Sequence, residues 1–152
     1  MQQYDQTPLI QMRGIIKTYN VGCENELEIL HGIDLDVYRG EFVAIVGESG
    51  SGKSTLMNII GVLDQPTNGS YFLDGVDVRK AGRDEMSDVR NTKIGLIFQN
   101  FNLIGRTTAK KNVELPMLYA GASRKLREER AAELLEMVGM GQRLSLIHIS
   151  EP

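Results

Sequence analysis

The sequence predicts an α/β fold, and three consecutive segments carry that prediction. Residues 42–46 are apolar at every position, which is typical of a parallel strand covered on both faces. A glycine-rich stretch follows at residues 47–52, and residues 54–63 then place apolar side chains around most of a helical circumference. A buried strand, a glycine loop and a buried helix in this order indicate an α/β domain.

The composition is that of one ordinary globular domain. The chain has 152 residues, of which 41% are apolar and 24% charged, with a formal net charge of -3 and a single cysteine. Its longest charge-free run, residues 94–105, is too short and polar to span a membrane, and the amino terminus lacks the pattern of an export signal. We therefore expect a cytoplasmic protein. Because it has no basic excess, we do not expect it to bind nucleic acid.

Hydrophobic periodicity predicts the remaining elements. Residues 9–38 alternate apolar with polar side chains, as half-buried strands do, and residues 94–98 form another apolar strand candidate. Residues 70–78 are a hairpin candidate with Asp74 and Gly75 at the turn. Helices are expected over residues 82–92, 108–119 and 123–138, the last capped by Ser123 and carrying Leu126, Leu134, Leu135 and Val138 on one side.

The strongest chemical signal is the glycine-rich stretch. It fits the pattern G-x-x-x-x-G-K-[ST] in the strand, loop and helix setting that this pattern requires. Its residues are Gly47, Glu48, Ser49, Gly50, Ser51, Gly52, Lys53, Ser54 and Thr55. A flexible glycine loop is the alternative interpretation, although a chance match in a chain of this composition is expected on the order of 1% of the time.

A loop of this kind cradles phosphate groups. Small residues let main-chain N–H groups point inward, and the amino terminus of the next helix adds partial positive charge. Lys53 would reach the β- and γ-phosphate oxygens, the Ser54 hydroxyl would help to coordinate Mg²⁺, and Thr55 would contact the α-phosphate. The loop alone does not distinguish a GTPase, a small-molecule kinase and a transporter ATPase.

The segments around the loop distinguish these classes. With the loop, and in this order and spacing, they resemble the nucleotide-binding subunit of ABC transporters, with the lipoprotein-releasing and macrolide-exporting type as the nearest branch. The matching segments are residues 17–19, 40–46, 56–61, 69–71, 97–100 and 112–116. The resemblance covers residues from about 10 to 143. It implies a P-loop NTPase of the ABC ATPase kind, with a RecA-like core, an antiparallel β subdomain and a helical subdomain.

The resemblance also implies functional residues and partners. Tyr19 would stack on the adenine of ATP, and Gln99 would approach Mg²⁺ and the attacking water, making Lys53 and Gln99 the catalytic residues. The alternatives are a half-buried strand tyrosine and a solvated glutamine. Residues 100–106 would dock a membrane permease, with Phe101, Leu103 and Ile104 either in that contact or in the core. A second nucleotide-binding domain would pair head to tail, at the cytoplasmic side of the inner membrane.

The resemblance stops before the hydrolytic half of the site. The family continues with an L-S-G-G-Q signature, a strand ending in Asp-Glu and a switch histidine, and the sequence contains none of these. We expect residues 1–143 to be the amino-terminal part of a nucleotide-binding domain, ending inside its helical subdomain. Residues 144–152 resemble the translation of a sequencing adaptor and are interpreted as a non-native tail, so His148 is not a switch histidine.

The expected function is divided between this chain and a longer parent protein. The parent would couple ATP binding and hydrolysis to export or release of cargo through a permease. This chain would bind nucleotide without turnover, because hydrolysis also needs carboxylates that the resemblance places further on. The loss of neighbouring strands beside residues 42–46 is expected to expose apolar surface. Two alternatives stay open: a non-catalytic nucleotide-binding fragment without a transport role, and another P-loop enzyme, although the guanine-reading motif N-K-x-D is absent.

Overall fold

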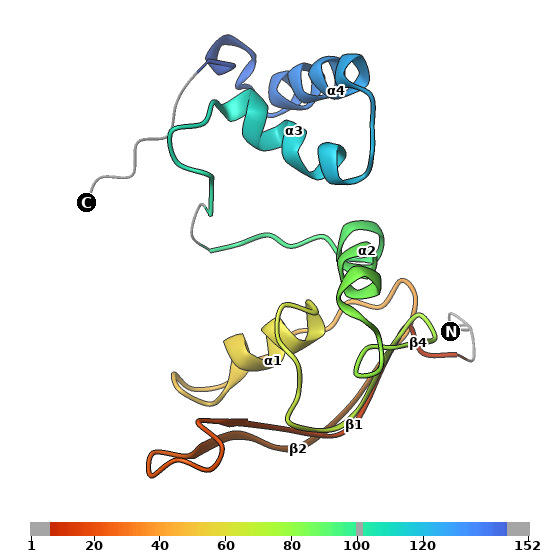
Figure 1. The fold of residues 1–152 in the computed structure, drawn as a ribbon, viewed down its shortest axis with the longest axis vertical. Coiled ribbons are helices and arrows are strands. Elements are labelled where there is room, and N and C mark those ends of the chain that lie inside the picture. Colours follow the sequence, from red (N-terminus) through yellow and green to blue (C-terminus); the bar gives the residue numbers. More distant parts are fainter. Residues whose placement is uncertain (1–6, 100–101, 146–152) are drawn as a thin grey trace. The chain divides into compact units, whose positions relative to one another are not determined.

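The computed structural model describes residues 7–99 and 102–145 (Figure 1). Asn100, Phe101 and residues 146–152, which include His148 and most of the segment interpreted as a tail, lie outside the described residues. The chain forms two compact units, Met1–Ile94 and Gly95–Pro152. The candidate phosphate loop belongs to the first unit, and Gln99 belongs to the second.

An antiparallel sheet forms the first unit, as the alternating residues 9–38 and the hairpin candidate predict. The strand order is β2-β1-β3-β4, with β1 at Ile10–Tyr19, β2 at Leu27–Val37, β3 at Asn68–Leu73 and β4 at Val76–Asp77. Asp74 and Gly75 make the β3–β4 turn with φ values of 50° and 81°, which confirms the predicted hairpin turn. Met12 and Ile15 of β1 are fully buried beneath the helices of this unit.

Helix α1 (Lys53–Ile60) covers one face of the sheet (Figure 1). Its side chains Leu56 and Ile59 join the core with β1, β2 and β3, and helix α2 (Arg83–Lys93) adds Met86 and Val89. Both predicted helices are therefore confirmed. We predicted that apolar side chains of α1 are buried around most of the helix. This prediction is wrong in part, because Met57 is 45% exposed.

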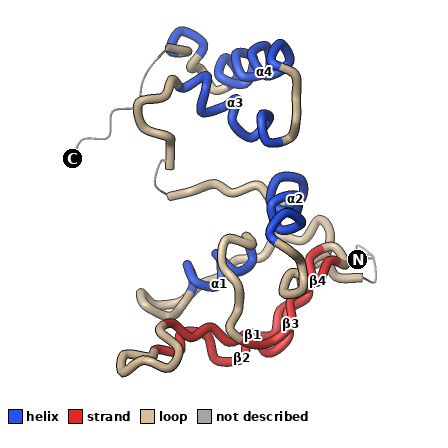
Figure 2. Tube along the Cα trace, viewed as in Figure 1, coloured by secondary structure: helices blue, strands red, loops and turns tan. Residues whose placement is uncertain are grey.

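Two predicted strands are not formed. Residues 42–46 and 94–98 run as loops (Figure 2). Phe42 and Val46 are 93% and 86% exposed, and Ile97 is fully exposed. A strand requires a neighbour that pairs with its N–H and C=O groups, and the described residues place no strand beside these segments. The strand predictions are therefore wrong here, whereas the expected apolar exposure at residues 42–46 is confirmed.

The second unit contains a helical pair. Helix α3 (Ala109–Tyr119) packs against α4 (Arg124–Met137), and a short 3-10 turn, η1, follows at Gly141–Arg143. The predicted cap is present, since the Ser123 hydroxyl accepts a hydrogen bond from the Leu126 N–H at 3.4 Å. Helix α4 buries Leu135, but Leu126 and Val138 are 55% and 70% exposed, because α3 covers only a narrow stripe of α4.

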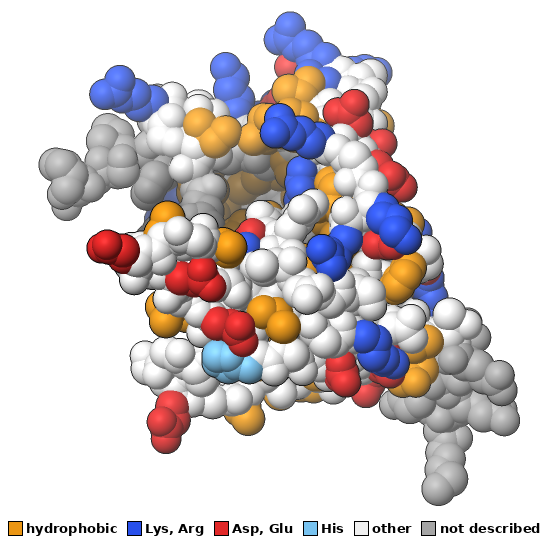
Figure 3. Space-filling view, turned by 60° about the horizontal axis from the view of Figure 1, so that its bottom comes forward, with side chains coloured by type: hydrophobic (Ala, Val, Ile, Leu, Met, Phe, Trp, Pro, Cys, Tyr) orange, Lys and Arg blue, Asp and Glu red, His pale blue; other side chains and the backbone are white. Residues whose placement is uncertain are grey.

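The surface carries mixed charge. Acidic, basic and apolar side chains are interspersed over the face shown in Figure 3. Within residues 7–99 and 102–145, no helix combines the length and the apolarity that crossing a lipid bilayer demands.

Tyr71 links the sheet to the end of α1 and provides a test of this packing. Its side chain is fully buried, and its hydroxyl donates to the Ile60 carbonyl at 2.7 Å. Replacing Tyr71 by Phe removes this donor from a partly buried carbonyl, so the free energy of unfolding should fall by about 1–2 kcal/mol. Urea unfolding measures the change. Tyr119→Phe, at a position 74% exposed, is the control, and equal midpoints for the two variants would refute the packing described for Tyr71.

Candidate functional site

The predicted phosphate loop is wrapped around the ammonium group of Lys53. Lys53 Nζ donates to the main-chain carbonyls of Gly47 at 3.0 Å and Glu48 at 2.8 Å. The Ser51 N–H donates to the same Glu48 carbonyl at 3.3 Å and turns the loop. The loop is therefore closed around a cation, and it is not buried beneath other side chains.

Gly52 is the point where the loop meets the sheet. Its φ is 71°, and a Cβ placed on it would lie 2.9 Å from Ile29 Cγ2, 3.0 Å from the Ile29 carbonyl oxygen and 3.1 Å from Leu30 Cδ2. A side chain is disfavoured by the left-handed backbone and crowded by the side chain and main chain of Ile29 in β2. Contact with β2 thus accounts for the second glycine of the motif.

A bulge in β2 produces this contact. Lys17 pairs with Leu30, but the next residue of β1, Thr18, pairs with Glu28, so Ile29 is an extra residue in β2. The extra residue brings two consecutive side chains, Ile29 and Leu30, against Gly52. Sequence reasoning missed this support, because no motif in β2 marks the bulge.

An open cavity of about 330 Å³ lies at the amino terminus of α1. Its lining contains one cation and no acidic side chain, and consists of Ile29, Ser49, Gly50, Gly52, Lys53, Ser54 and Thr55. No side chain caps α1, and its first turn contains no acidic residue. The N–H groups of that turn therefore remain available to a ligand, with the positive end of the helix dipole behind them. This chemistry favours an anion.

A triphosphate with Mg²⁺ fits these residues. The loop offers main-chain N–H groups, the Lys53 ammonium and the hydroxyls of Ser54 and Thr55, all of them donors suited to phosphate oxygens. Among the described residues, no group of three or more His, Cys, Asp or Glu side chains is placed to hold a metal ion. Phosphate oxygens together with the Ser54 hydroxyl would supply oxygen ligands to Mg²⁺.

Tyr19 ends β1 and pairs with Leu27, in the part of β2 that leads to the cavity wall. Ile29, which lines the cavity, follows Leu27 by two positions. The Tyr19 ring is 38% exposed, and its stacking on adenine stays a prediction.

The other predicted site residues lie in the second unit. Gln99 is exposed there, and its role toward Mg²⁺ stays a prediction. Leu103 and Ile104, predicted for the core or for a permease contact, are 47% and 50% exposed. Asn112 holds this segment, since its Oδ1 accepts from the Ile104 N–H at 2.8 Å. Beside it lies a groove of about 290 Å³, lined by Ile104, Thr107, Lys111, Glu114, Leu115, Leu118 and Arg127.

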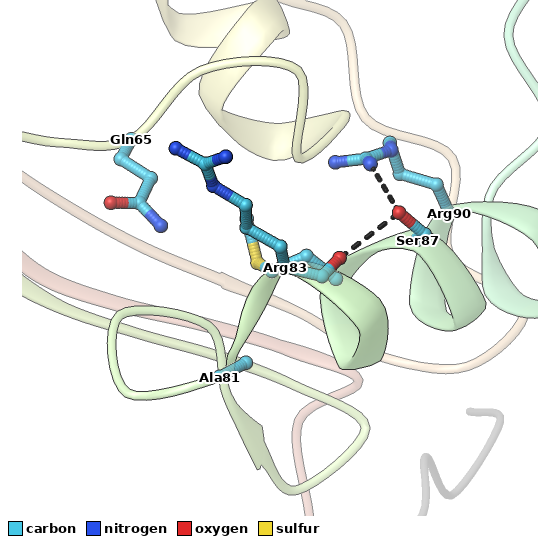
Figure 4. Close-up of a pocket in the computed structure, with 6 residues that line it drawn as sticks. Gln65, Ala81, Arg83, Ser87 and Arg90 are labelled. Carbon is cyan, nitrogen blue, oxygen red and sulfur yellow. Dashed lines mark hydrogen bonds between the residues drawn. The ribbon is translucent and has the colours of Figure 1, made fainter.

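A third depression, in the first unit, has a structural explanation. It measures about 270 Å³ and is lined by Gln65, Ala81, Arg83, Met86, Ser87 and Arg90 (Figure 4). Arg90 donates to the Val62 carbonyl and to the Ser87 hydroxyl, both at 3.0 Å. The bond to Val62 ties α2 to the residues that follow α1, so Arg90 serves the packing of the unit.

Comparison with known proteins decides the family. The model of the ABC transporter family matches residues 30–150. The chain belongs to the ABC transporter family. An uncharacterized ABC transporter ATP-binding protein, YknY of Bacillus subtilis, is 52% identical over 136 residues, which are 90% of this chain and 59% of YknY. The macrolide export ATP-binding/permease protein MacB of Nitrosomonas europaea is 50% identical over 141 residues, covering 93% of this chain and 21% of MacB.

Solved structures of ABC cassettes share the fold. The dimeric ATP-binding cassette MJ0796, in a post-hydrolysis state bound to ADP and Pi, has a TM-score of 0.79 at 41% identity and covers 90% of this chain and 60% of that one. A second dimeric structure of MJ0796, described as a bacterial ABC transporter cassette, has a TM-score of 0.80 at 41% identity. The match covers 92% of this chain and 61% of the MJ0796 chain. The predicted ABC ATPase fold and family are confirmed. The chain spans 59% of YknY and a smaller share of MacB.

The contact at Gly52 gives a direct test of the site in this ABC chain. In Gly52→Ala the new Cβ would lie 2.9 Å from Ile29 Cγ2 and 3.0 Å from the Ile29 carbonyl oxygen, on a backbone with a φ of 71°, so the loop must shift, and we expect tripolyphosphate and ATP to bind at least about ten-fold more weakly. Calorimetric titration measures both affinities. Gly82→Ala, where a Cβ meets nothing within 4 Å, is the control. Wild-type affinity in Gly52→Ala would contradict the role given to this glycine.

Proposed function

We propose that residues 47–55 bind the triphosphate of ATP together with Mg²⁺. The observation that carries the proposal is the acid-free cavity at the uncapped amino terminus of α1, with the Lys53 ammonium in its lining. Family membership supports ATP as the nucleotide, since YknY is named as an ATP-binding protein. The same membership argues against the alternative of a GTPase or kinase from another P-loop class.

Each residue of the loop has a role in this proposal. Lys53 exchanges its two carbonyl acceptors for the charged β- and γ-phosphate oxygens, which form stronger hydrogen bonds with an ammonium group. The Ser54 hydroxyl joins the coordination of Mg²⁺, and Thr55 contacts the α-phosphate. The remaining loop residues, Gly47 to Gly52, contribute main-chain N–H groups.

Tyr19 supplies the binding surface for the base. Stacking of a base on an aromatic ring is worth about 1–3 kcal/mol and does not depend on the base's hydrogen-bonding pattern. Tyr19 therefore adds affinity for the nucleoside end of ATP, while the loop binds the phosphate end.

The whole protein, we propose, couples ATP binding and hydrolysis to export or release of a substrate through a membrane permease. MacB is named as an export ATP-binding/permease protein, and MJ0796 is described as dimeric. The permease would occupy the groove beside Ile104 and Leu118 in the second unit. A second nucleotide-binding domain would pair head to tail, on the cytoplasmic side of the membrane. Gln99 would approach Mg²⁺ and the attacking water in that assembly, whereas this chain alone would bind ATP without hydrolysing it.

Removing the ammonium group tests the proposal. Lys53→Ala deletes the one cation of the cavity lining, so we expect ATP–Mg²⁺ to bind about 10- to 100-fold more weakly, in line with the loss of charge-assisted hydrogen bonds. Titration calorimetry measures the affinity, and a phosphate-release assay should detect no turnover in either protein. Lys80→Ala is the matched control, because the Lys80 side chain is 85% exposed. The proposed function fails if Lys53→Ala binds ATP as tightly as Lys80→Ala.

A further inference from the structure

One carboxylate ties together two side chains of β1. Lys17 Nζ donates to Asp64 Oδ1 at 2.7 Å and to the Gln65 carbonyl at 2.8 Å. The Tyr19 hydroxyl donates to the other carboxylate oxygen, Asp64 Oδ2, at 3.3 Å. Asp64 lies in the segment between α1 and β3, so this network joins the end of β1 to the residues that follow α1.

The same lysine covers one face of the Tyr19 ring. Lys17 Nζ lies 5.0 Å from the ring centroid, in the geometry of a cation–π contact. The Lys17 side chain is only 11% exposed, so its position is fixed by its surroundings. Because Lys17 occupies one face of the ring, which is 38% exposed, a base would have to stack on the opposite face.

Asp64 is ionised at neutral pH and can hold both partners. Burial raises the pKa of its carboxyl group, but the hydrogen bond and charge of Lys17, with further hydrogen bonds from the Gln65 N–H and Tyr19, bring the pKa below its ordinary value. The network is therefore fully formed at the pH at which ATP binding is measured.

We propose that Asp64 and Lys17 are positioning residues for the nucleobase, holding the Tyr19 ring so that the face opposite Lys17 stacks on the base of a nucleotide seated in the loop. The inference rests on the proposed function and adds two residues that do not line the phosphate cavity. A tethered ring loses less conformational freedom on stacking, so the network raises affinity for a nucleotide without raising affinity for its phosphates. If the network served only to stabilise the fold, its loss would lower the affinities for ATP and tripolyphosphate equally.

Paired titrations with ATP–Mg²⁺ and tripolyphosphate–Mg²⁺ separate these two roles. Asp64→Asn removes the charge that orients Lys17 and Tyr19, so we expect ATP to bind about three- to ten-fold more weakly. The affinity for tripolyphosphate should change by no more than about two-fold. The matched control is Asp36→Asn, which breaks the Arg13–Asp36 ion pair, 2.6 Å long, at the other end of β1. It should alter neither affinity.

Tyr19→Phe provides a second variant that keeps the ring and removes only the tether. The affinity for ATP should fall about three-fold, and the affinity for tripolyphosphate should stay unchanged. If circular dichroism shows that Asp64→Asn does not fold, Tyr19→Phe decides the question. Equal losses for the two ligands in Asp64→Asn, or wild-type affinity for ATP, would overturn the inference. If the wild-type chain binds neither ligand, the proposed function itself falls, and the inference falls with it.

Discussion

The site depends on a single close contact between a loop and a strand. Gly52, immediately before α1, lies so close to β2 that a Cβ would be 2.9 Å from Ile29 Cγ2 and 3.0 Å from the Ile29 carbonyl oxygen. The segment that leads into the loop gives little support, since Phe42 and Val46 are largely exposed and residues 42–46 pair with no described strand. The bulge in β2 therefore supports the loop through Gly52.

Electrostatics favours an anion at the loop. The helix start has no side-chain cap, the cavity lining contains no carboxylate, and the Lys53 ammonium donates to the neutral carbonyls of Gly47 and Glu48. Uncapped N–H groups and an ammonium bonded to neutral carbonyls gain stability when an anion binds them. A polyphosphate would supply acceptors to both, which supports the proposal of a phosphate ligand.

Local features of the fold could be predicted from the sequence. The Asp74-Gly75 turn and the Ser123 cap depend on residues within three or four positions of one another, and both were predicted. The phosphate loop was found for the same reason, because its motif specifies backbone conformation locally. Family membership followed from the order of several such segments.

Features that depend on distant partners could not be predicted in this way. The bulge at Ile29 depends on register with β1, and the Asp64 network joins residues 45 and 47 positions apart. Neither has a local sequence signal. The apolar runs at residues 42–46 and 94–98 predicted buried strands, but a strand forms only beside another strand, and the described residues provide none there, so Phe42, Val46 and Ile97 are exposed.

The central claim is that main-chain N–H groups at the start of α1 hold the phosphates of ATP. Amide resonances in a 15N–1H NMR titration with ATP–Mg²⁺ report on these groups directly. We expect the largest shifts at residues 50–55, with the same residues responding to tripolyphosphate and with Tyr19 and Leu27 responding to ATP alone. Unchanged amides at residues 50–55 under saturating ATP–Mg²⁺ would contradict the account.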